Sequence, residues 1–188
     1  MSRVQLVQKE QALPEVKEMY EKMEAGGTDI LNLYRVLAHN ADVMRFFLRL
    51  GSSLLTKAEL SPKLRELVIM RIAKLTGSEY EWTQHHPIAL AVGVSQVQLE
   101  AVSHWNSSGV FNDEERAVLQ YADEVAQNVV AKDETFRTLQ RYLSERSIVE
   151  LTISIGYWGM VARLLVPLQV DIDTQSLSSA LKFIGRKG

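Results

Sequence analysis

The sequence predicts an all-α domain, and three observations support this fold class. Glycine and proline are scarce, with 10 and 4 copies in 188 residues, so few residues interrupt helices. Apolar residues recur three and four positions apart, which is the period of an amphipathic helix. No stretch shows the strict alternation of apolar and polar residues that indicates a half-buried strand. We therefore expect several helices joined by short connections.

Three helices are expected in the first part of the chain. Pro14 stands early in the first turn of the first helix, and a glycine pair at 26–27 closes it. The second is expected over residues 30–38 and the third over residues 41–55, because each carries an apolar stripe at helical spacing.

A buried central helix is expected over residues 64–75. Ser61 is a suitable N-cap, and Pro62 suits the first helical position. The stretch is apolar almost all round, which is typical of a helix covered on every side. Gly77 ends it, and another helix begins at Ser78 or the next residue.

Two capping boxes organise the next part of the chain. Ser95 and Asn112 are each followed three residues later by the partner of such a box, Gln98 and Glu115. The second box opens a helix over residues 114–130.

Two more helices are expected towards the C-terminus. Asp133 caps a short helix that ends near Leu143, and residues 144–165 form a long helix rich in apolar and small residues. Pro167 marks the end of that long helix.

Length and charge indicate one ordinary domain over residues 1–188. The formal net charge of −2 gives no electrostatic reason to expect nucleic-acid binding. The first ten residues lack the apolar core of a signal peptide, and no apolar run approaches the length of a membrane span. A cytoplasmic protein is therefore expected, and the absence of cysteine agrees with that compartment.

The strongest candidate site lies on the helix that begins near residue 78. Ser78, Glu81 and His85 are spaced i, i+3 and i+7, so they share one helical face. A hydroxyl, a carboxylate and an imidazole on one face are suited to acid–base chemistry. The alternative is that Glu81 and His85 form an exposed i, i+4 pair with little effect on stability.

Glu66 is a second candidate, because it projects from the apolar central helix. A carboxylate there must be paired or hydrogen-bonded. Its partner is either an arginine such as Arg65 or Arg71, for structure, or His85, for chemistry. Glu81 and His85 could also supply two ligands to a metal, but zinc needs at least three protein ligands. We therefore expect no metal and no other cofactor.

Aromatic and arginine side chains are candidates for substrate contact. Tyr157, Trp158 and Arg163 lie on the long apolar helix, either as core residues or as a cavity wall with an arginine that binds a substrate carboxylate. Arg71 is the alternative arginine, and Trp82 lies on the helix of the candidate site.

Several of these segments also resemble a known family. Residues 64–68 (LRELV), 76–82 (TGSEYEW), 85 (H) and 93–95 (GVS) resemble the core of the carboxymuconolactone decarboxylase and alkyl hydroperoxidase D superfamily. The resemblance covers about residues 35–130. In the hydroperoxidase branch a glutamate precedes a Cys-x-x-Cys pair and a histidine. Glu66, Ser78, Glu81 and His85 occupy those four positions here.

The resemblance implies a compact all-α domain of the alkyl hydroperoxidase D-like type that self-associates, commonly as a trimer or hexamer. Thiol peroxidase chemistry needs a thiolate and a resolving thiol, and this chain has no cysteine. Residues 81–85 instead match the acidic-aromatic-x-x-His pattern of the decarboxylase branch. What the resemblance implies is a cofactor-free lyase or proton-transfer enzyme that acts on a small unsaturated carboxylate or lactone.

The same resemblance suggests a role for each residue. His85 delivers a proton to a dienolate, Glu81 holds the tautomer of His85, and Glu66 orients the pair. Ser78 hydrogen-bonds the enolate oxygen, and Arg163 or Arg71 binds a carboxylate. The alternative is a non-catalytic scaffold or ligand-binding protein that lost the redox cysteines and kept the fold.

Overall fold

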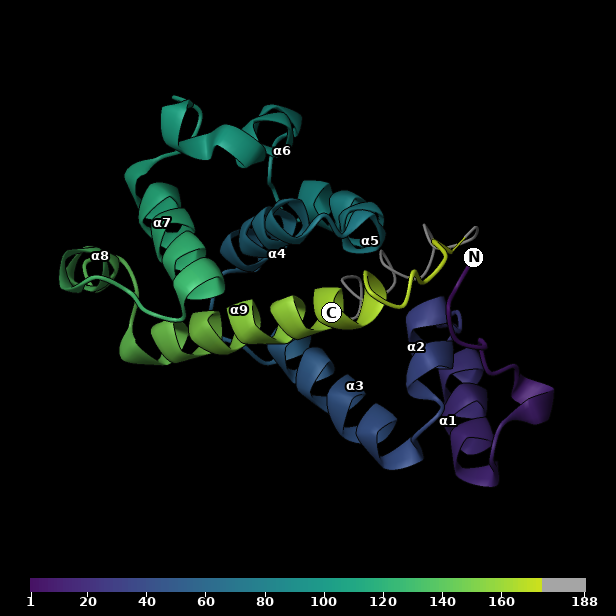
Figure 1. Cartoon of the computed structure of the whole chain (residues 1–188). Coiled ribbons are helices and arrows are strands. Elements are labelled where there is room, and N and C mark those ends of the chain that lie inside the picture. The colour runs from purple at the N-terminus through teal and green to yellow at the C-terminus, as the bar shows by residue number, and fades with distance from the viewer. Residues whose placement is uncertain (174–188) are drawn as a thin grey trace.

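The computed structural model describes residues 1–173, which fold as a bundle of α-helices with two 3₁₀ segments (Figure 1). The elements in chain order are η1 (Lys9–Gln11), α1 (Pro14–Ala25), α2 (Asn32–Leu37), α3 (Ala41–Thr56), α4 (Pro62–Thr76), α5 (Glu79–Ala91), α6 (Gln96–Ala101), η2 (Val102–Ser107), α7 (Asp113–Asn128), α8 (Asp133–Leu139) and α9 (Glu145–Leu165).

The predicted all-α fold is confirmed, and the expected helices are present with small shifts at their ends. Both capping boxes form, at Ser95 and at Asn112. The short helix predicted from Asp133 ends at Leu139, and Lys132 rather than Asp133 is its N-cap. The 3₁₀ segment η2 was not expected, because its sequence has no helical apolar stripe.

Helix α4 is the central element of the fold. It packs against α5, α7, α9 and η2. Its buried side chains divide between two apolar clusters: Val68, Ile69 and Ile72 join the larger one, whereas Leu67 and Met70 join the other. Each such side chain contributes roughly 1.5–3 kcal/mol on burial, so α4 fixes the positions of its neighbours.

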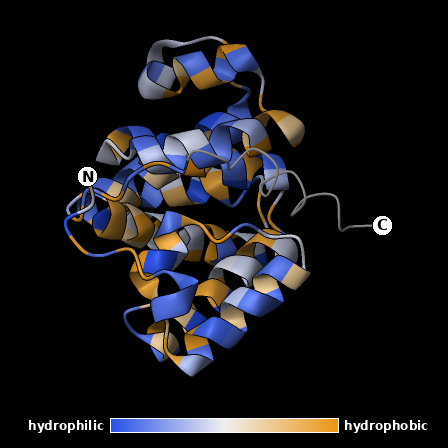
Figure 2. Ribbon diagram, turned by 90° about the vertical axis from the view of Figure 1, so that its right-hand side faces the viewer, coloured by the Kyte–Doolittle hydropathy of each residue, from blue (hydrophilic) through white to orange (hydrophobic). Residues whose placement is uncertain are grey.

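Helix α9 crosses the molecule between α4 and α5 on one side and α3 on the other (Figure 1). It is the one helix in residues 1–173 whose length and apolar composition would suit a membrane span, although the sequence showed no uninterrupted apolar run of that length. More than half of its most apolar window is buried inside the protein, as in a core helix of a bundle. Figure 2 shows that the helices of the bundle carry both hydrophilic and hydrophobic residues.

A tight turn between α4 and α5 brings the candidate residues together. Gly77 has φ +65°, a left-handed conformation that favours glycine, and it ends α4. The Ser78 hydroxyl then accepts a hydrogen bond from the Glu81 backbone N–H and caps α5. The two helices pack together along their lengths, so Glu66 on α4 faces His85 on α5.

The segment that follows α9 returns to α2 and α5. Asp173 accepts hydrogen bonds from the Asn32 backbone N–H at 2.8 Å, from the Gln84 amide at 3.3 Å and from the Tyr80 hydroxyl. Together with the hydrogen bond from the Leu33 backbone N–H to the Tyr80 hydroxyl, this carboxylate ties α2 and α5 to the end of the described chain.

Gly51 allows α3 to approach α9 closely, and this generates a stability prediction. A Cβ on Gly51 would overlap the Tyr157 hydroxyl and lie 2.8 Å from its Cζ. We expect Gly51→Ala to lower the free energy of unfolding by about 1–3 kcal/mol, as overpacking does. Urea denaturation measures the change.

The matched control is Gly156→Ala on α9. Gly156 is exposed and a Cβ there meets nothing within 4 Å. Alanine is the better helix former by up to about 1 kcal/mol, so this variant should be as stable as the wild type or more so. Equal stability of the two variants would show that the Gly51 contact is not tight.

Candidate functional site

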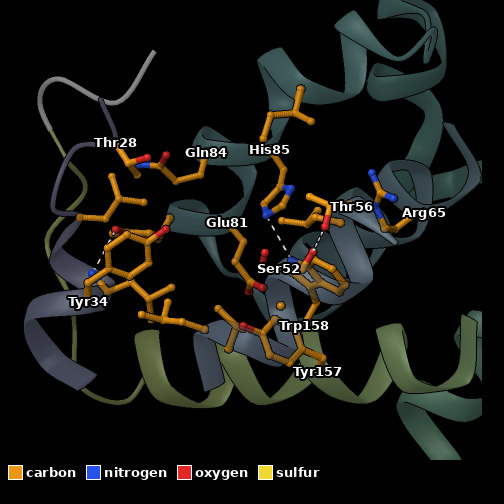
Figure 3. Close-up of a pocket in the computed structure, with 18 of the residues that line it drawn as sticks. Thr28, Tyr34, Ser52, Thr56, Arg65, Glu81, Gln84, His85, Tyr157 and Trp158 are labelled. Carbon is orange, nitrogen blue, oxygen red and sulfur yellow. Dashed lines mark hydrogen bonds between the residues drawn. The ribbon is translucent and has the colours of Figure 1, made fainter. Parts of the chain in front are cut away.

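A cavity of about 540 Å³ lies between the ends of α1 and α2, the middle of α3, the start of α4, and α5 and α9. This size is typical of small-molecule sites. The lining residues are mainly apolar and aromatic: Met23, Thr28, Leu31, Leu33, Tyr34, Leu48, Gly51, Ser52, Leu55, Thr56, Pro62, Arg65, Tyr80, Glu81, Gln84, His85, Ile88, Val92, Tyr157, Trp158 and Val161. Figure 3 shows Glu81 and His85 of α5 together with Tyr157 and Trp158 of α9 around it.

His85 is held at both ring nitrogens. Its Nδ1 lies 2.8 Å from Oε2 of Glu66, which is fully buried. The Trp158 indole N–H donates to Nε2 over 3.1 Å, and the two rings meet edge to face. The sequence left open whether Glu66 pairs with an arginine or with His85, and the structure contains the contact with His85.

These two contacts define the tautomer of His85. An indole N–H can only donate, so Nε2 must be the acceptor and carry no proton. Nδ1 then carries the proton of the neutral ring, and this N–H donates a hydrogen bond to the Glu66 carboxylate. Glu66, rather than Glu81 as the sequence suggested, is the residue that fixes this tautomer.

The second oxygen of Glu66 faces an arginine. Its Oε1 lies 3.4 Å from Nε of Arg65, and Nη1 of Arg65 donates to the Leu54 carbonyl over 3.2 Å. Arg65 is itself buried and lines the cavity. The sequence offered Arg65 as one possible structural partner of Glu66 and did not predict that it lines the cavity.

Glu81 is the unusual charged group of the cavity. It is 2% exposed, and within residues 1–173 neither of its carboxyl oxygens has a hydrogen-bond partner. Burial raises the pKa of Glu81 from 4.5 to about 7 because the charged form loses hydration. Nearby Ser78 and His85 act in the opposite direction on this pKa, but with smaller effect. At neutral pH Glu81 can therefore both give and accept a proton.

The other residues named from the sequence lie in different places. Tyr157 lines the cavity and donates to the Phe47 carbonyl. The Ser78 side chain is buried as the cap of α5, outside the cavity lining.

Three residues proposed for substrate contact are not in the cavity wall. Arg71 forms a two-pronged ion pair with Asp123 at 2.7 and 2.8 Å. Arg163 is exposed and donates to a carbonyl of its own helix. Trp82 lies under Lys74, whose Nζ is 3.6 Å from the ring centroid. The sequence pattern of α9 did not show that Arg163 faces outwards. The residues beside it are apolar, so no polar face of the helix stands out there.

No group of three or more His, Asp or Glu side chains in residues 1–173 is arranged to hold a metal ion. The structure therefore gives no third ligand to the Glu81 and His85 pair that the sequence offered.

The tautomer of His85 can be measured directly. We expect long-range ¹H–¹⁵N NMR spectra to show His85 neutral and protonated at Nδ1, which is the rarer tautomer for an unrestrained imidazole. Glu66→Leu combined with Trp158→Phe should shift the ring towards the Nε2-protonated form, since both the acceptor on Nδ1 and the donor on Nε2 are then lost. His39, whose Nε2 contacts the Gln5 carbonyl, is an internal control and should not change. Protonation of His85 at Nε2 in the wild type would contradict the assignment.

The raised pKa of Glu81 makes stability depend on pH. The folded protein holds this proton more tightly than the unfolded chain, so the contribution is complete below the unfolded pKa of 4.5 and is lost as the pH rises through about 7. Glu81→Gln, which is always neutral, should match the wild type near pH 4. It should be more stable near pH 8 by up to about 3 kcal/mol, on the basis of 1.36 kcal/mol per pKa unit.

Denaturation of both proteins across this pH range measures that difference. The control is Glu79→Gln, which removes an exposed carboxylate from the same helix and should show no such growth between pH 5 and 8. A constant difference between Glu81→Gln and the wild type at all pH values would refute the raised pKa.

Comparison with known proteins agrees with this picture. The model of the carboxymuconolactone decarboxylase family matches residues 41–124, which contain Glu66, Glu81 and His85. The uncharacterized protein YnjA of Escherichia coli K12 is 33% identical over 124 residues, which are 64% of this chain and 66% of that protein. The match thus spans about two thirds of the length of this relative.

Solved structures share the fold. An uncharacterized peroxidase-related protein from Ralstonia eutropha JMP134 superposes with a TM-score of 0.79 at 16% identity, over 95% of this chain and 96% of that one. A cysteine-to-alanine variant of the debrominase Bmp8, in complex with 2,3,4-tribromopyrrole, gives a TM-score of 0.75 at 21% identity, over 97% of this chain and all of that one. At these identities the likeness shows the fold alone. With the family match, it confirms the resemblance seen in the sequence: this chain is a cysteine-less protein of the carboxymuconolactone decarboxylase and alkyl hydroperoxidase D-like superfamily.

Proposed function

We propose that this protein is a cofactor-free proton-transfer enzyme, of lyase or isomerase type, acting on a small unsaturated carboxylate or lactone in the 540 Å³ cavity. The single observation that carries the proposal is Glu81. A buried carboxyl group whose two oxygens have no hydrogen-bond partner within residues 1–173, with a pKa near 7 and a place in the wall of a cavity, is suited to proton transfer at neutral pH.

In this proposal Glu81 rather than His85 carries the proton. Both nitrogens of His85 are already engaged, by Glu66 and by Trp158, so the neutral ring has no proton free for a ligand. Arg65, Glu66 and His85 form a connected polar network on α4 and α5, and His85 links it to Trp158 on α9, beside Glu81. His85 is therefore a positioning residue, and Ser78 acts by capping the helix that presents Glu81.

The chemistry follows from one mobile proton. Removal of a proton from the carbon between a carbonyl and a double bond, or loss of CO₂ from a substrate whose carboxylate is β or vinylogous to a carbonyl, leaves a dienolate. Protonated Glu81 then delivers its proton to carbon and becomes a carboxylate. In isomerisation, that carboxylate removes the proton from the carbon of the next substrate molecule and is protonated again. After decarboxylation, it takes up a proton from water instead. No redox partner is needed, which agrees with the absence of cysteine.

A ligand-binding protein without catalysis is the second candidate, and one observation favours it. Bmp8 holds 2,3,4-tribromopyrrole on the same fold, so this type of bundle can bind a small ring. In both candidates the ligand is the same kind of molecule, and they differ in whether Glu81 exchanges a proton with carbon.

Isomerisation of α-angelica lactone to its conjugated isomer in D₂O tests the proposal, because NMR reports both the product and the deuterium taken up at carbon. Glu81→Gln should lower the rate by about a hundredfold or more, the usual scale for a general acid or base. Glu79→Gln, on the exposed face of α5, should retain the wild-type rate. Equal turnover by Glu81→Gln and the wild type would refute the role of Glu81, and lactone binding without exchange would favour the binding protein.

Two further expectations remain proposals. We propose that the chain self-associates, and the exposed apolar side chains Val149, Ile153 and Met160 along α9 support this. We also propose a cytoplasmic location, supported by the absence of cysteine.

A further inference from the structure

The charge of the cavity wall limits what can bind in it. Within residues 1–173, Arg65 is the one lysine or arginine that lines the cavity. Its guanidinium is buried, lies 3.4 Å from the Glu66 carboxylate and donates to the Leu54 carbonyl. Glu66 therefore already balances this positive charge, and the wall offers no free cation to an anionic ligand.

Glu81 makes the cavity less suited to anions still. When ionised it adds a negative charge whose two oxygens have no partner among residues 1–173. A ligand carboxylate would lose its own hydration and lie close to this like charge, in surroundings of low dielectric constant. In its protonated form, by contrast, Glu81 presents an O–H donor that a neutral carbonyl oxygen can accept.

The remaining wall suits a flat apolar molecule. Tyr34, Tyr157 and Trp158 supply aromatic surface, and Ile88 and Val161 supply aliphatic surface. Planar unsaturated rings pack well against such side chains.

We propose that the substrate enters the cavity as an uncharged unsaturated ring, a lactone or cyclic enone, and not as a free carboxylate. The inference rests on the proposed function in taking the Glu81 cavity as the reaction site, and it selects between the two substrate classes named there. The neutral carbonyl accepts the proton of Glu81, and the carbon skeleton fills the aromatic part of the wall.

A matched pair of ligands with one carbon skeleton tests this. 3,4-Dihydrocoumarin is a neutral lactone, and 3-(2-hydroxyphenyl)propanoate is its ring-opened carboxylate. At about pH 6.5, where Glu81 is largely protonated and the ligand carboxylate is ionised, calorimetry should show the lactone binding at least about tenfold more tightly. Equal binding, or tighter binding of the carboxylate, would overturn the inference.

A variant tests the cause. Glu66→Gln removes the charge that balances Arg65, so the carboxylate should bind about tenfold more tightly than to the wild type while the lactone changes less. Glu79→Gln makes the same change in net charge outside the cavity and should leave both affinities unchanged. An unaltered carboxylate affinity in folded Glu66→Gln would contradict the balancing role of Glu66. If that variant does not fold, the comparison of the two ligands on the wild-type protein still tests the inference.

The inference about the ligand and the proposed reaction can be refuted independently of each other. Preference for the lactone without isomerisation of α-angelica lactone would support the inference and refute the proposed reaction. Preference for the carboxylate together with Glu81-dependent turnover would refute the inference and leave the reaction standing.

Discussion

The structure of the site depends on one buried carboxylate, Glu66. It is fully buried on the central helix, and each of its oxygens faces a different partner, Arg65 and His85. Removing either partner would leave an incompletely paired charge in the core, which proteins rarely tolerate. Through His85 the same network reaches Trp158 on α9. Three helices are thereby held in one arrangement, and the cavity lies beside that junction.

This arrangement explains why two carboxylates only 15 positions apart behave differently. Glu66 has a cation against one oxygen and a hydrogen-bond donor against the other. Glu81 lies at the cavity wall without a hydrogen-bond partner among residues 1–173, and burial raises its pKa to about 7. Environment rather than residue type thus distinguishes the two carboxylates. The chain has no cysteine, and the first positions of α5 hold a cap, Ser78, and a buried carboxyl group, Glu81.

The bundle also shows how small residues contribute to the site. Gly77 reverses the chain between α4 and α5, and Gly51 lets the Tyr157 ring lie against α3. Gly51 also lines the cavity, whereas Gly77 does not. Both determine how closely the helices approach, and hence the shape of the cavity wall that Tyr157 and Trp158 form.

The sequence by itself determined the all-α class, the caps at Ser95 and Asn112 and the buried character of α4, and it singled out Glu66, Glu81 and His85 as candidates. These follow from local periodicity and capping, which the order of residues records directly. Only the tertiary structure decided which carboxylate contacts His85, that Trp158 donates to its other nitrogen, and that Arg65 rather than Arg71 or Arg163 lines the cavity. The physical reason is that these contacts join different helices. Helical spacing places a residue on a face of its own helix, whereas its partner is set by the angle and distance at which another helix packs.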